Sequence, residues 1–152
     1  MKKILVVLLV ALSINGFAQQ KEIEWHTDVN NAVNISVQTG KPLLLFFTGK
    51  DWCPPCKMTA KYVFESQEFA KWSKKCVLVE LDFPRGKKRS QIPPEYIKLA
   101  QDLNVRSYPT MWFVRTSLID GQPQLQSIKP IVGGSKDANA WISQANKILN
   151  TK

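Results

Sequence analysis

Four segments along the chain, three of them mainly apolar and the last a mixture of apolar and polar residues, predict β-strands. The first segment is almost entirely apolar, which is typical of a strand that is buried on both faces. The last two segments flank Asp120-Gly121, a dipeptide that favours the tight turn of a β-hairpin. We therefore expect four strands, over residues 41–48, 76–83, 110–116 and 124–132.

Apolar residues spaced three and four positions apart predict helices between and after these strands. One helix is expected over 28–38, where Gly40 follows as a stop signal, and another is expected over 94–103. The C-terminal segment predicts a helix that Ser135 caps. Its sustained apolar stripe consists of Ala138, Trp141, Ile142, Ala145, Ile148 and Leu149.

The segment 57–64 is free of glycine and proline and predicts one more helix. We expect this helix to bury Met58, Tyr62 and Val63 and to break near Ser66, which can cap a second helical piece that runs to Trp72. Helices that alternate with strands, closed by one hairpin, predict an α/β fold. The expected architecture is a central mixed β-sheet flanked by helices on both faces.

The first residues of the chain have the pattern of an export signal. Two lysines precede an apolar run over 4–12, and the small residue Ala18 follows that run. The run is short for a helix that spans a bilayer. We expect residues 1–18 to be a signal peptide and 19–152 to be a single domain, exported to the periplasm or secreted without stable membrane insertion. The alternative is a retained membrane anchor.

The formal net charge of +9 is spread along the chain apart from one basic cluster at 85–89. A cluster of this kind can bind nucleic acid or an acidic membrane surface. Pro84 and the pair Pro93-Pro94 bound the cluster, which favours a loop inserted between a strand and a helix. For an exported chain we expect a solvated loop and no nucleic-acid partner.

The strongest chemical signal is the pair of cysteines in the stretch Trp52-Cys53-Pro54-Pro55-Cys56-Lys57. The motif follows a predicted strand and opens a predicted helix, so Cys53 is expected to be the N-cap residue. At a helix N-terminus the unpaired N–H groups and the helix dipole favour a thiolate. The pattern therefore predicts redox chemistry.

Together with the later stretch Asn104-Val105-Arg106-Ser107-Tyr108-Pro109-Thr110, this motif resembles the thioredoxin family. The resemblance extends over roughly residues 22–150 and implies a thioredoxin-like fold. It also implies that Pro109 is a cis-proline placed against the disulfide. The segment 47–53 is similar to exported thioredoxin-like proteins rather than to cytosolic thioredoxins.

The resemblance implies a role for each residue of the two motifs. Cys53 would be the exposed nucleophile that forms a mixed disulfide with a substrate, and Cys56 would be the buried thiol that resolves it. The surface that binds the substrate would consist of Trp52, Pro54, Pro55, Tyr108 and Pro109.

Two features depart from the ordinary thioredoxin pattern. Pro54 stands where thioredoxins have glycine, and it removes one N–H that could stabilise a Cys53 thiolate. The strand before the motif also lacks the aspartate that lies under the resolving cysteine in thioredoxins. Our hypothesis is that Glu80, from the neighbouring strand, lies beneath Cys56 and accepts its proton. The alternative is that Glu80 pairs with a lysine or points to an edge of the sheet.

Cys76 and His26 have simpler structural interpretations. Cys76 makes the cysteine count odd, which allows an intermolecular disulfide, but its place at the head of an apolar strand favours a small buried residue. A zinc site would need Cys53, Cys56, Cys76 and His26 to converge from separate parts of the chain. We expect no metal and no cofactor.

Two classes of function remain open. The first is a thiol–disulfide oxidoreductase that acts on disulfide-containing or dithiol exported proteins, with the reductase direction slightly favoured. A membrane or soluble redox partner would have to recycle such an enzyme. The second is a non-catalytic scaffold in which Cys53–Cys56 is a structural disulfide.

Overall fold

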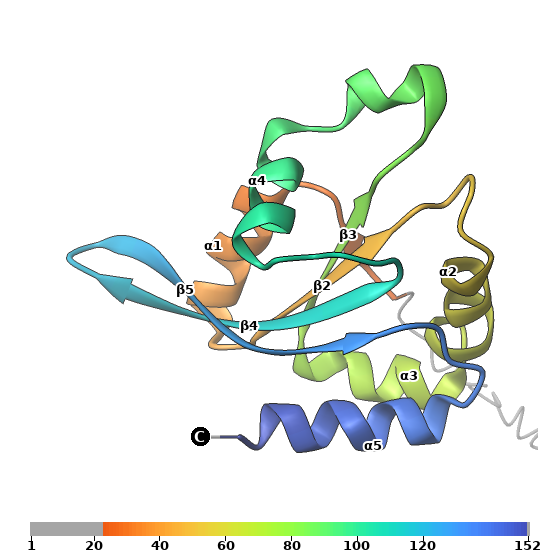
Figure 1. The fold of residues 1–152 in the computed structure, drawn as a ribbon. Helices are drawn as coiled ribbons and strands as arrows, with labels where there is room; N and C mark the ends of the chain where they lie inside the picture. The colour runs from red at the N-terminus through yellow and green to blue at the C-terminus, as the bar shows by residue number, and fades with distance from the viewer. Residues whose placement is uncertain (1–22, 152) are drawn as a thin grey trace, which may run out of the picture.

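The computed structural model describes residues 23–151, apart from the side chain of Lys87 (Figure 1). The predicted signal peptide at 1–18 lies outside these residues. No helix in the described part of the chain is long and apolar enough to cross a membrane.

A five-stranded mixed sheet forms the centre of the fold, with the strand order β1-β3-β2-β4-β5 (Figure 1). Strands β1, β3 and β2 run parallel, and β4 and β5 pair antiparallel to complete the sheet. The four predicted strands are confirmed, whereas β1 is too short to leave a pattern in the sequence. The bounds are β1 Trp25–His26, β2 Leu43–Thr48, β3 Val77–Asp82, β4 Thr110–Ile119 and β5 Gln122–Val132.

Within residues 23–151, five α-helices accompany the sheet, and each lies within or next to a segment predicted to be helical. A π-helical turn at 60–64 joins α2 to α3, and short 3-10 helices at 73–75 and 86–91 precede β3 and α4. The bounds are α1 Val29–Thr39, α2 Pro54–Thr59, α3 Gln67–Trp72, α4 Pro94–Asp102 and α5 Ala138–Leu149.

The helices cover both faces of the sheet, as predicted (Figure 1). Strand β2 shows how this arrangement follows from its sequence, because its six residues are all buried. Leu44 and Phe46 point toward the cluster that contains α2, α3 and α5, while Leu43, Leu45 and Phe47 point toward α1 and α4. A strand that lies between two helical layers needs apolar side chains along nearly its whole length, and in β2 only the last residue, Thr48, is polar.

Two local predictions about the helices were wrong. Helix α5 is capped by Asp137, not Ser135, because the Asp137 carboxylate accepts a hydrogen bond from the Ala140 N–H at 2.9 Å. Tyr62 is 47% exposed rather than buried. The helix that follows Cys56 widens into a π-helical turn, which places Phe64 in the core together with Val63, whose predicted burial is confirmed.

Candidate active site

Cys53 and Cys56 form a disulfide, with an S–S distance of 2.06 Å, at the start of α2. Cys53 is the N-cap of this helix, as predicted, and its sulfur accepts a hydrogen bond from the Cys56 N–H at 3.2 Å. Pro54 occupies the first helical position, where its fixed φ suits the helix and no N–H is needed. The local sequence therefore both starts the helix and aims the sulfur at its N-terminus.

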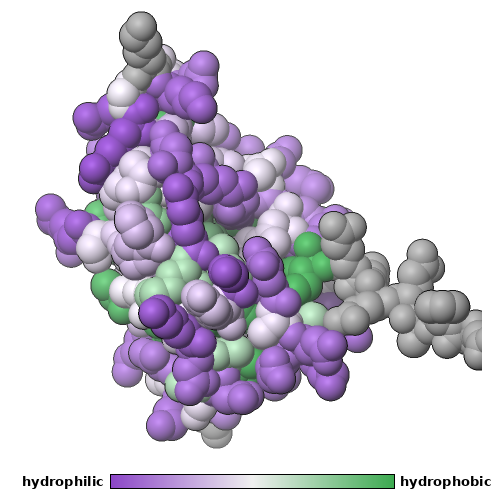
Figure 2. Space-filling model, turned by 90° about the vertical axis from the view of Figure 1, so that its right-hand side faces the viewer, coloured by the Kyte–Doolittle hydropathy of each residue, from purple (hydrophilic) through white to green (hydrophobic). Residues whose placement is uncertain are grey.

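Cys53 is more enclosed than expected. It is only 2% exposed and belongs, with Cys56, to the apolar cluster under α2. The prediction of an exposed nucleophile is therefore wrong for the oxidised form, because Trp52 and Tyr108 pack against the same cluster. Pro54 and Pro55 are exposed. Figure 2 shows one face of the molecule, where less hydrophilic side chains gather in the middle and hydrophilic side chains surround them.

Trp52 is held in place by three different contacts. Its indole N–H donates a hydrogen bond to the Phe83 carbonyl at 2.7 Å. Its ring meets the Tyr108 ring edge to face at 5.4 Å, and the Arg85 guanidinium lies 3.5 Å from its centre. These three contacts therefore fix the position of the Trp52 side chain beside the disulfide.

Gly49 makes this position of Trp52 possible. A methyl group added at Gly49 would overlap the Trp52 indole ring. We expect Gly49→Ala to displace the ring, to break its bond to Phe83 and to slow reaction with a peptide disulfide several-fold. Tryptophan fluorescence and the rate of peptide-disulfide reduction measure both effects. Gly121→Ala is the control for a strained glycine substitution away from the site, since Gly121 has a φ of +73° but its added methyl group would meet no atom within 4 Å. Equal rates for all three proteins would contradict this role of Gly49.

The second predicted motif lies at the same end of the sheet, where it leads into β4. The peptide bond between Tyr108 and Pro109 is cis. Pro109 is buried, and its carbonyl accepts a hydrogen bond from the Gly133 N–H at 2.9 Å. Burial raises the pKa of the Tyr108 hydroxyl, and the positive charge of Arg89 partly opposes this rise. The structure thus brings Trp52 of one motif against Tyr108 of the other.

Thr59 connects the back of α2 to the loop before α5, a contact that the sequence analysis missed. Its hydroxyl donates to the Pro55 carbonyl and accepts from the Ser135 N–H, both at 3.0 Å. Gly134 lies so close to Pro55 and Met58 that an added methyl group would meet them at 2.9–3.0 Å. Thr59 is fully buried. The only signal in the sequence is a threonine three positions after Cys56, inside the predicted helix.

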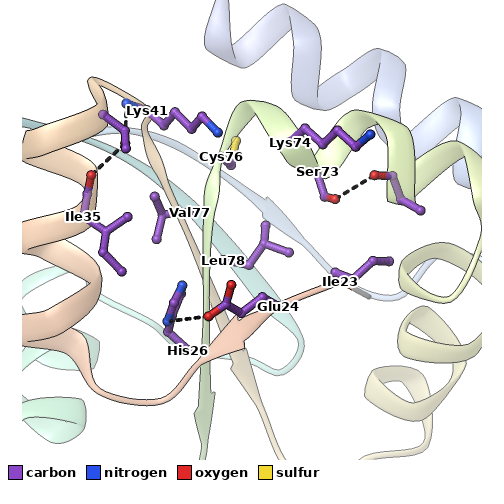
Figure 3. A pocket seen from close by; sticks show the side chains of 12 residues that line it. Ile23, Glu24, His26, Ile35, Lys41, Ser73, Lys74, Cys76, Val77 and Leu78 are labelled. Carbon is purple, nitrogen blue, oxygen red and sulfur yellow. Dashed lines mark hydrogen bonds and ion pairs between the residues drawn. The ribbon is translucent and has the colours of Figure 1, made fainter. Parts of the chain in front are cut away.

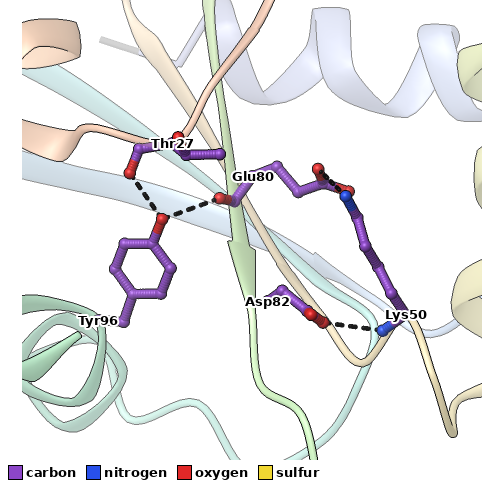
Figure 4. A network of polar contacts seen from close by, with 5 residues as sticks. All are labelled: Thr27, Lys50, Glu80, Asp82 and Tyr96. Atoms are coloured by element: carbon purple, nitrogen blue, oxygen red, sulfur yellow. Dashed lines mark hydrogen bonds and ion pairs between the residues drawn. The ribbon is translucent and has the colours of Figure 1, made fainter. Parts of the chain in front are cut away.

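Glu80 forms an ion pair with Lys50, with 2.6 Å between Glu80 Oε2 and Lys50 Nζ (Figure 4). The pairing of Glu80 with a lysine was the alternative in the sequence analysis. Figure 4 also shows the Lys50 backbone N–H bound to the Asp82 carboxylate at 2.8 Å. Lys50 therefore engages both acidic residues of β3 and ties the loop before the cysteines to that strand.

The Glu80 side chain lies on the face of the sheet that carries α2. Glu80 pairs in register with Phe46, which packs in the same cluster as both cysteines. It also lines a pocket of about 390 Å³ together with Ala60. The Ala60 N–H bonds to the Cys56 carbonyl, so Ala60 lies one helical turn after that cysteine.

Cys76 lines a pocket of about 300 Å³ whose lining includes neither Cys53 nor Cys56. Figure 3 shows this pocket. The Cys76 thiol is free and the residue is 7% exposed, which confirms the prediction of a small buried residue. Burial raises the pKa of this thiol to about 12, while the positive charges of Lys75 and Lys41 act in the opposite direction. Figure 3 shows Cys76 between Lys41 and Lys74 at the rim of the pocket.

We expect Cys76 to resist alkylation at neutral pH, because only the thiolate reacts and burial disfavours the thiolate. Its reaction with iodoacetamide should accelerate as the pH rises from about 9 toward about 12. For the same reason, the stability that the neutral thiol contributes is present below pH 9.0 and declines above it. Mass spectrometry of the Cys53→Ser/Cys56→Ser variant isolates this thiol. Rapid labelling of Cys76 in the folded Cys53→Ser/Cys56→Ser variant at pH 7 would contradict the prediction.

His26 lines the Cys76 pocket and lies 3.9 Å from the Glu24 carboxylate, far along the chain from the disulfide. Over residues 23–151 no cluster of three or more histidine, cysteine or acidic side chains is arranged to hold a metal ion.

Comparisons with known proteins agree with this geometry. The Thioredoxin-like family matches residues 24–115. The thioredoxin-related protein DsbJ of Chlamydia pneumoniae is 32% identical over 116 residues, which cover 72% of this chain but only 33% of that protein. The disulfide bond reductase DsbH of Chlamydia pneumoniae is 31% identical over 132 residues, which cover 86% of this chain and 75% of that protein.

The fold agrees as well. The solved structure of a DsbH oxidoreductase superposes with a TM-score of 0.64 at 24% identity, over 86% of each chain. The mixed sheet with helices on both faces is the thioredoxin-like fold. Since the family match covers more than half of the residues and DsbH is matched along most of its length, this chain belongs to the thioredoxin-like family.

Proposed function

We propose that the protein is a thiol–disulfide oxidoreductase, with Cys53 as the nucleophile and Cys56 as the resolving cysteine. The observation that carries this proposal is the Cys53–Cys56 disulfide at the first turn of α2, with Cys53 as its N-cap. A sulfur in this position has a hydrogen-bond donor in the Cys56 N–H and the favourable end of the helix dipole. Both act to stabilise the thiolate that the reaction needs.

In the reductase direction, the Cys53 thiolate attacks one sulfur of a substrate disulfide. The substrate S–S bond breaks, a mixed disulfide forms, and the released substrate sulfur takes up a proton. Cys56 then loses its proton and attacks the Cys53 sulfur. This step releases the second substrate thiol, so the substrate gains two electrons and the protein is left with the Cys53–Cys56 disulfide. A dithiol partner must reduce this disulfide before the next cycle.

The reductase direction is supported by the relative that is described as a disulfide bond reductase, at 31% identity. The leader-like pattern at 1–18 supports action on exported proteins, in the periplasm or outside the cell. In such an oxidising environment a reductase needs a membrane or soluble partner that supplies electrons. We therefore propose disulfide-containing exported proteins as substrates and a separate redox partner for recycling.

Turnover of a synthetic peptide disulfide tests this function against the scaffold alternative. With dithiothreitol at a concentration that reduces the peptide slowly, the reductase should accelerate release of peptide thiols in proportion to protein concentration. The Cys53→Ser variant is the matched control. A rate equal to that of dithiothreitol alone would favour a scaffold with a structural disulfide.

We further propose that Glu80 accepts the proton of Cys56. Glu80 lies on the α2 face of the sheet and shares a pocket with Ala60, one turn after Cys56. The ion pair with Lys50 supports this role, because it holds the Glu80 carboxylate in position at the pocket. The Lys50 side chain itself is 58% exposed and does not fill the pocket. Glu80 is only partly buried, with 19% of its side chain exposed, and pairing reduces the cost of holding this carboxylate against apolar side chains.

We expect Glu80→Gln to slow resolution of the mixed disulfide at least tenfold, because general-base assistance from the carboxylate is lost. Rapid mixing of the reduced protein with excess peptide disulfide, followed by acid quenching and mass analysis, measures the decay of the mixed disulfide. Its rate should be followed as a function of pH.

Glu65→Gln is the matched control, since Glu65 lines the same pocket but is exposed. The Glu65 variant should keep both the rate and its pH dependence. If Glu80→Gln lowers only the melting temperature and leaves the resolution rate unchanged, Glu80 has the purely structural role of an ion-pair partner.

A further inference from the structure

A groove runs from Trp52 and Tyr108, beside the disulfide, toward α4. It has a volume of about 580 Å³. Apolar and aromatic side chains form much of its lining, including Phe83, Ile92 and Ile97. A second hollow of about 290 Å³ shares Phe83, Ile97 and Arg106 with it and continues along α4.

Three arginines also line this groove, and we refer to it as the arginine groove. Arg85 and Arg89 belong to the segment between β3 and α4, which forms the green arch in Figure 1. Arg106 approaches from the loop before β4. All three side chains are exposed, and none of the lining residues is acidic.

Within the described part of the chain, the guanidinium groups of the arginine groove have no acidic partners. Over residues 23–151, no ion pair joins Arg85, Arg89 or Arg106 to a carboxylate. Arg85 lies over the Trp52 ring, and Arg106 Nε donates to the Asn104 side chain at 2.6 Å. Both contacts orient a guanidinium while leaving other N–H donors unused, since the group carries five donors. Three positive charges that converge without compensation favour an anionic occupant.

We propose that the arginine groove binds an acidic side chain of a polypeptide substrate, next to the disulfide bond that Cys53 attacks. The proposal rests on the proposed oxidoreductase function and names the substrate class of the same site. A carboxylate matches the fork of a guanidinium, which binds it through two parallel N–H···O bonds. The apolar lining suits the rest of the peptide segment, and Trp52 places the groove directly beside Cys53 in the chain.

The positive charge of Arg89 lies close to Tyr108, one of the aromatic residues beside the disulfide. Arg89 is close enough to Tyr108 to oppose the rise in the pKa of its hydroxyl. Tyr108 in turn contacts Trp52, the residue before Cys53. A substrate carboxylate held by Arg89 would therefore lie beside the aromatic surface that borders the disulfide, within a few residues of the cysteine under attack.

The test compares two synthetic peptide disulfides that differ only in one residue beside a cysteine, glutamate or glutamine. For each peptide, the kcat/KM value with the wild-type protein is divided by the rate constant for reduction of the same peptide by dithiothreitol alone. The quantity compared is the ratio of these two normalised values. This normalisation removes the effect of the glutamate on the intrinsic reactivity of the peptide. We expect a three- to tenfold preference for the glutamate peptide at low salt, which diminishes as ionic strength rises.

The Arg89→Gln/Arg106→Gln variant should lose this preference. Lys71→Gln/Lys147→Gln is the matched control, since it removes the same charge from exposed positions on α3 and α5, outside the groove. This control should keep the preference. Circular dichroism and melting temperatures establish that both variants are folded.

The outcomes separate this proposal from the proposed function. No reduction of either peptide would contradict the oxidoreductase function itself. Equal rates for the two peptides, or a preference that survives in Arg89→Gln/Arg106→Gln, would overturn the assignment of the arginine groove alone. Faster reduction of glutathione disulfide than of the glutamate peptide would also overturn it, because the groove would then serve a small anionic disulfide.

Discussion

The reduced Cys56→Ser variant is expected to accumulate a stable mixed disulfide with a peptide substrate, while Cys53→Ser forms none. In the first variant the nucleophile can still attack, but no thiol remains to resolve the intermediate. Both variants should lose turnover completely. The experiment is best done with Cys76→Ala in the background, so that the free thiol at that position cannot react.

Intact-mass analysis after acid quenching detects the adduct, and proteolytic mapping locates it. The expected adduct carries one half of the peptide on Cys53. An adduct that forms equally well in Cys53→Ser, on Cys56, would contradict the assignment of nucleophile and resolving cysteine. The absence of any adduct in both variants would favour the scaffold alternative.

Phe69→Ala is expected to destabilise the fold by about 3–5 kcal/mol, the usual range when a fully buried phenylalanine is truncated. Phe69 is 0% exposed and lies at the centre of an aromatic cluster. Its ring centroid lies 4.7–6.2 Å from those of Trp25, Phe64, Trp72 and Trp141. Because both cysteines pack in the same apolar cluster, the loss should also loosen the site.

Urea denaturation of the oxidised proteins measures this difference in unfolding free energy. Tyr62→Ala is the matched control, since it removes an aromatic ring that is largely exposed on the π-helical turn. We expect the control to change stability by about 0.5 kcal/mol or less. Similar losses for both variants would mean that Phe69 is not central to the core.

The fold could be predicted because its main elements carry strong local patterns. Strand β2 is a run of buried apolar residues, α5 has a long apolar stripe, and Asp120-Gly121 marks the hairpin. The cap of α5 was missed because Ser135 and Asp137 are both good capping residues. The choice between them depends on tertiary contacts, since Ser135 is held by Thr59.

Features of the site that depend on residues close together in the chain could be predicted from the sequence. Features that depend on contacts between distant residues could not. The Cys53 cap follows from local sequence. The enclosure of Cys53 and the stacking of Arg85 on Trp52 depend on how separate loops meet, which one sequence does not reveal. Strand register also decides which side chains meet, so the pairing of Glu80 with Lys50 stayed one of two alternatives until the fold was known.

The measurement that tests the central claim most directly is the reduction potential of Cys53–Cys56. The oxidised protein would be equilibrated in defined thiol–disulfide buffers, and the free thiols would be trapped and counted by mass. A reductase should gain two thiols together and reversibly, with a midpoint near about −270 mV. A midpoint below about −300 mV would indicate a structural disulfide, and one near about −120 mV would indicate a disulfide donor; either result would contradict the proposed reductase.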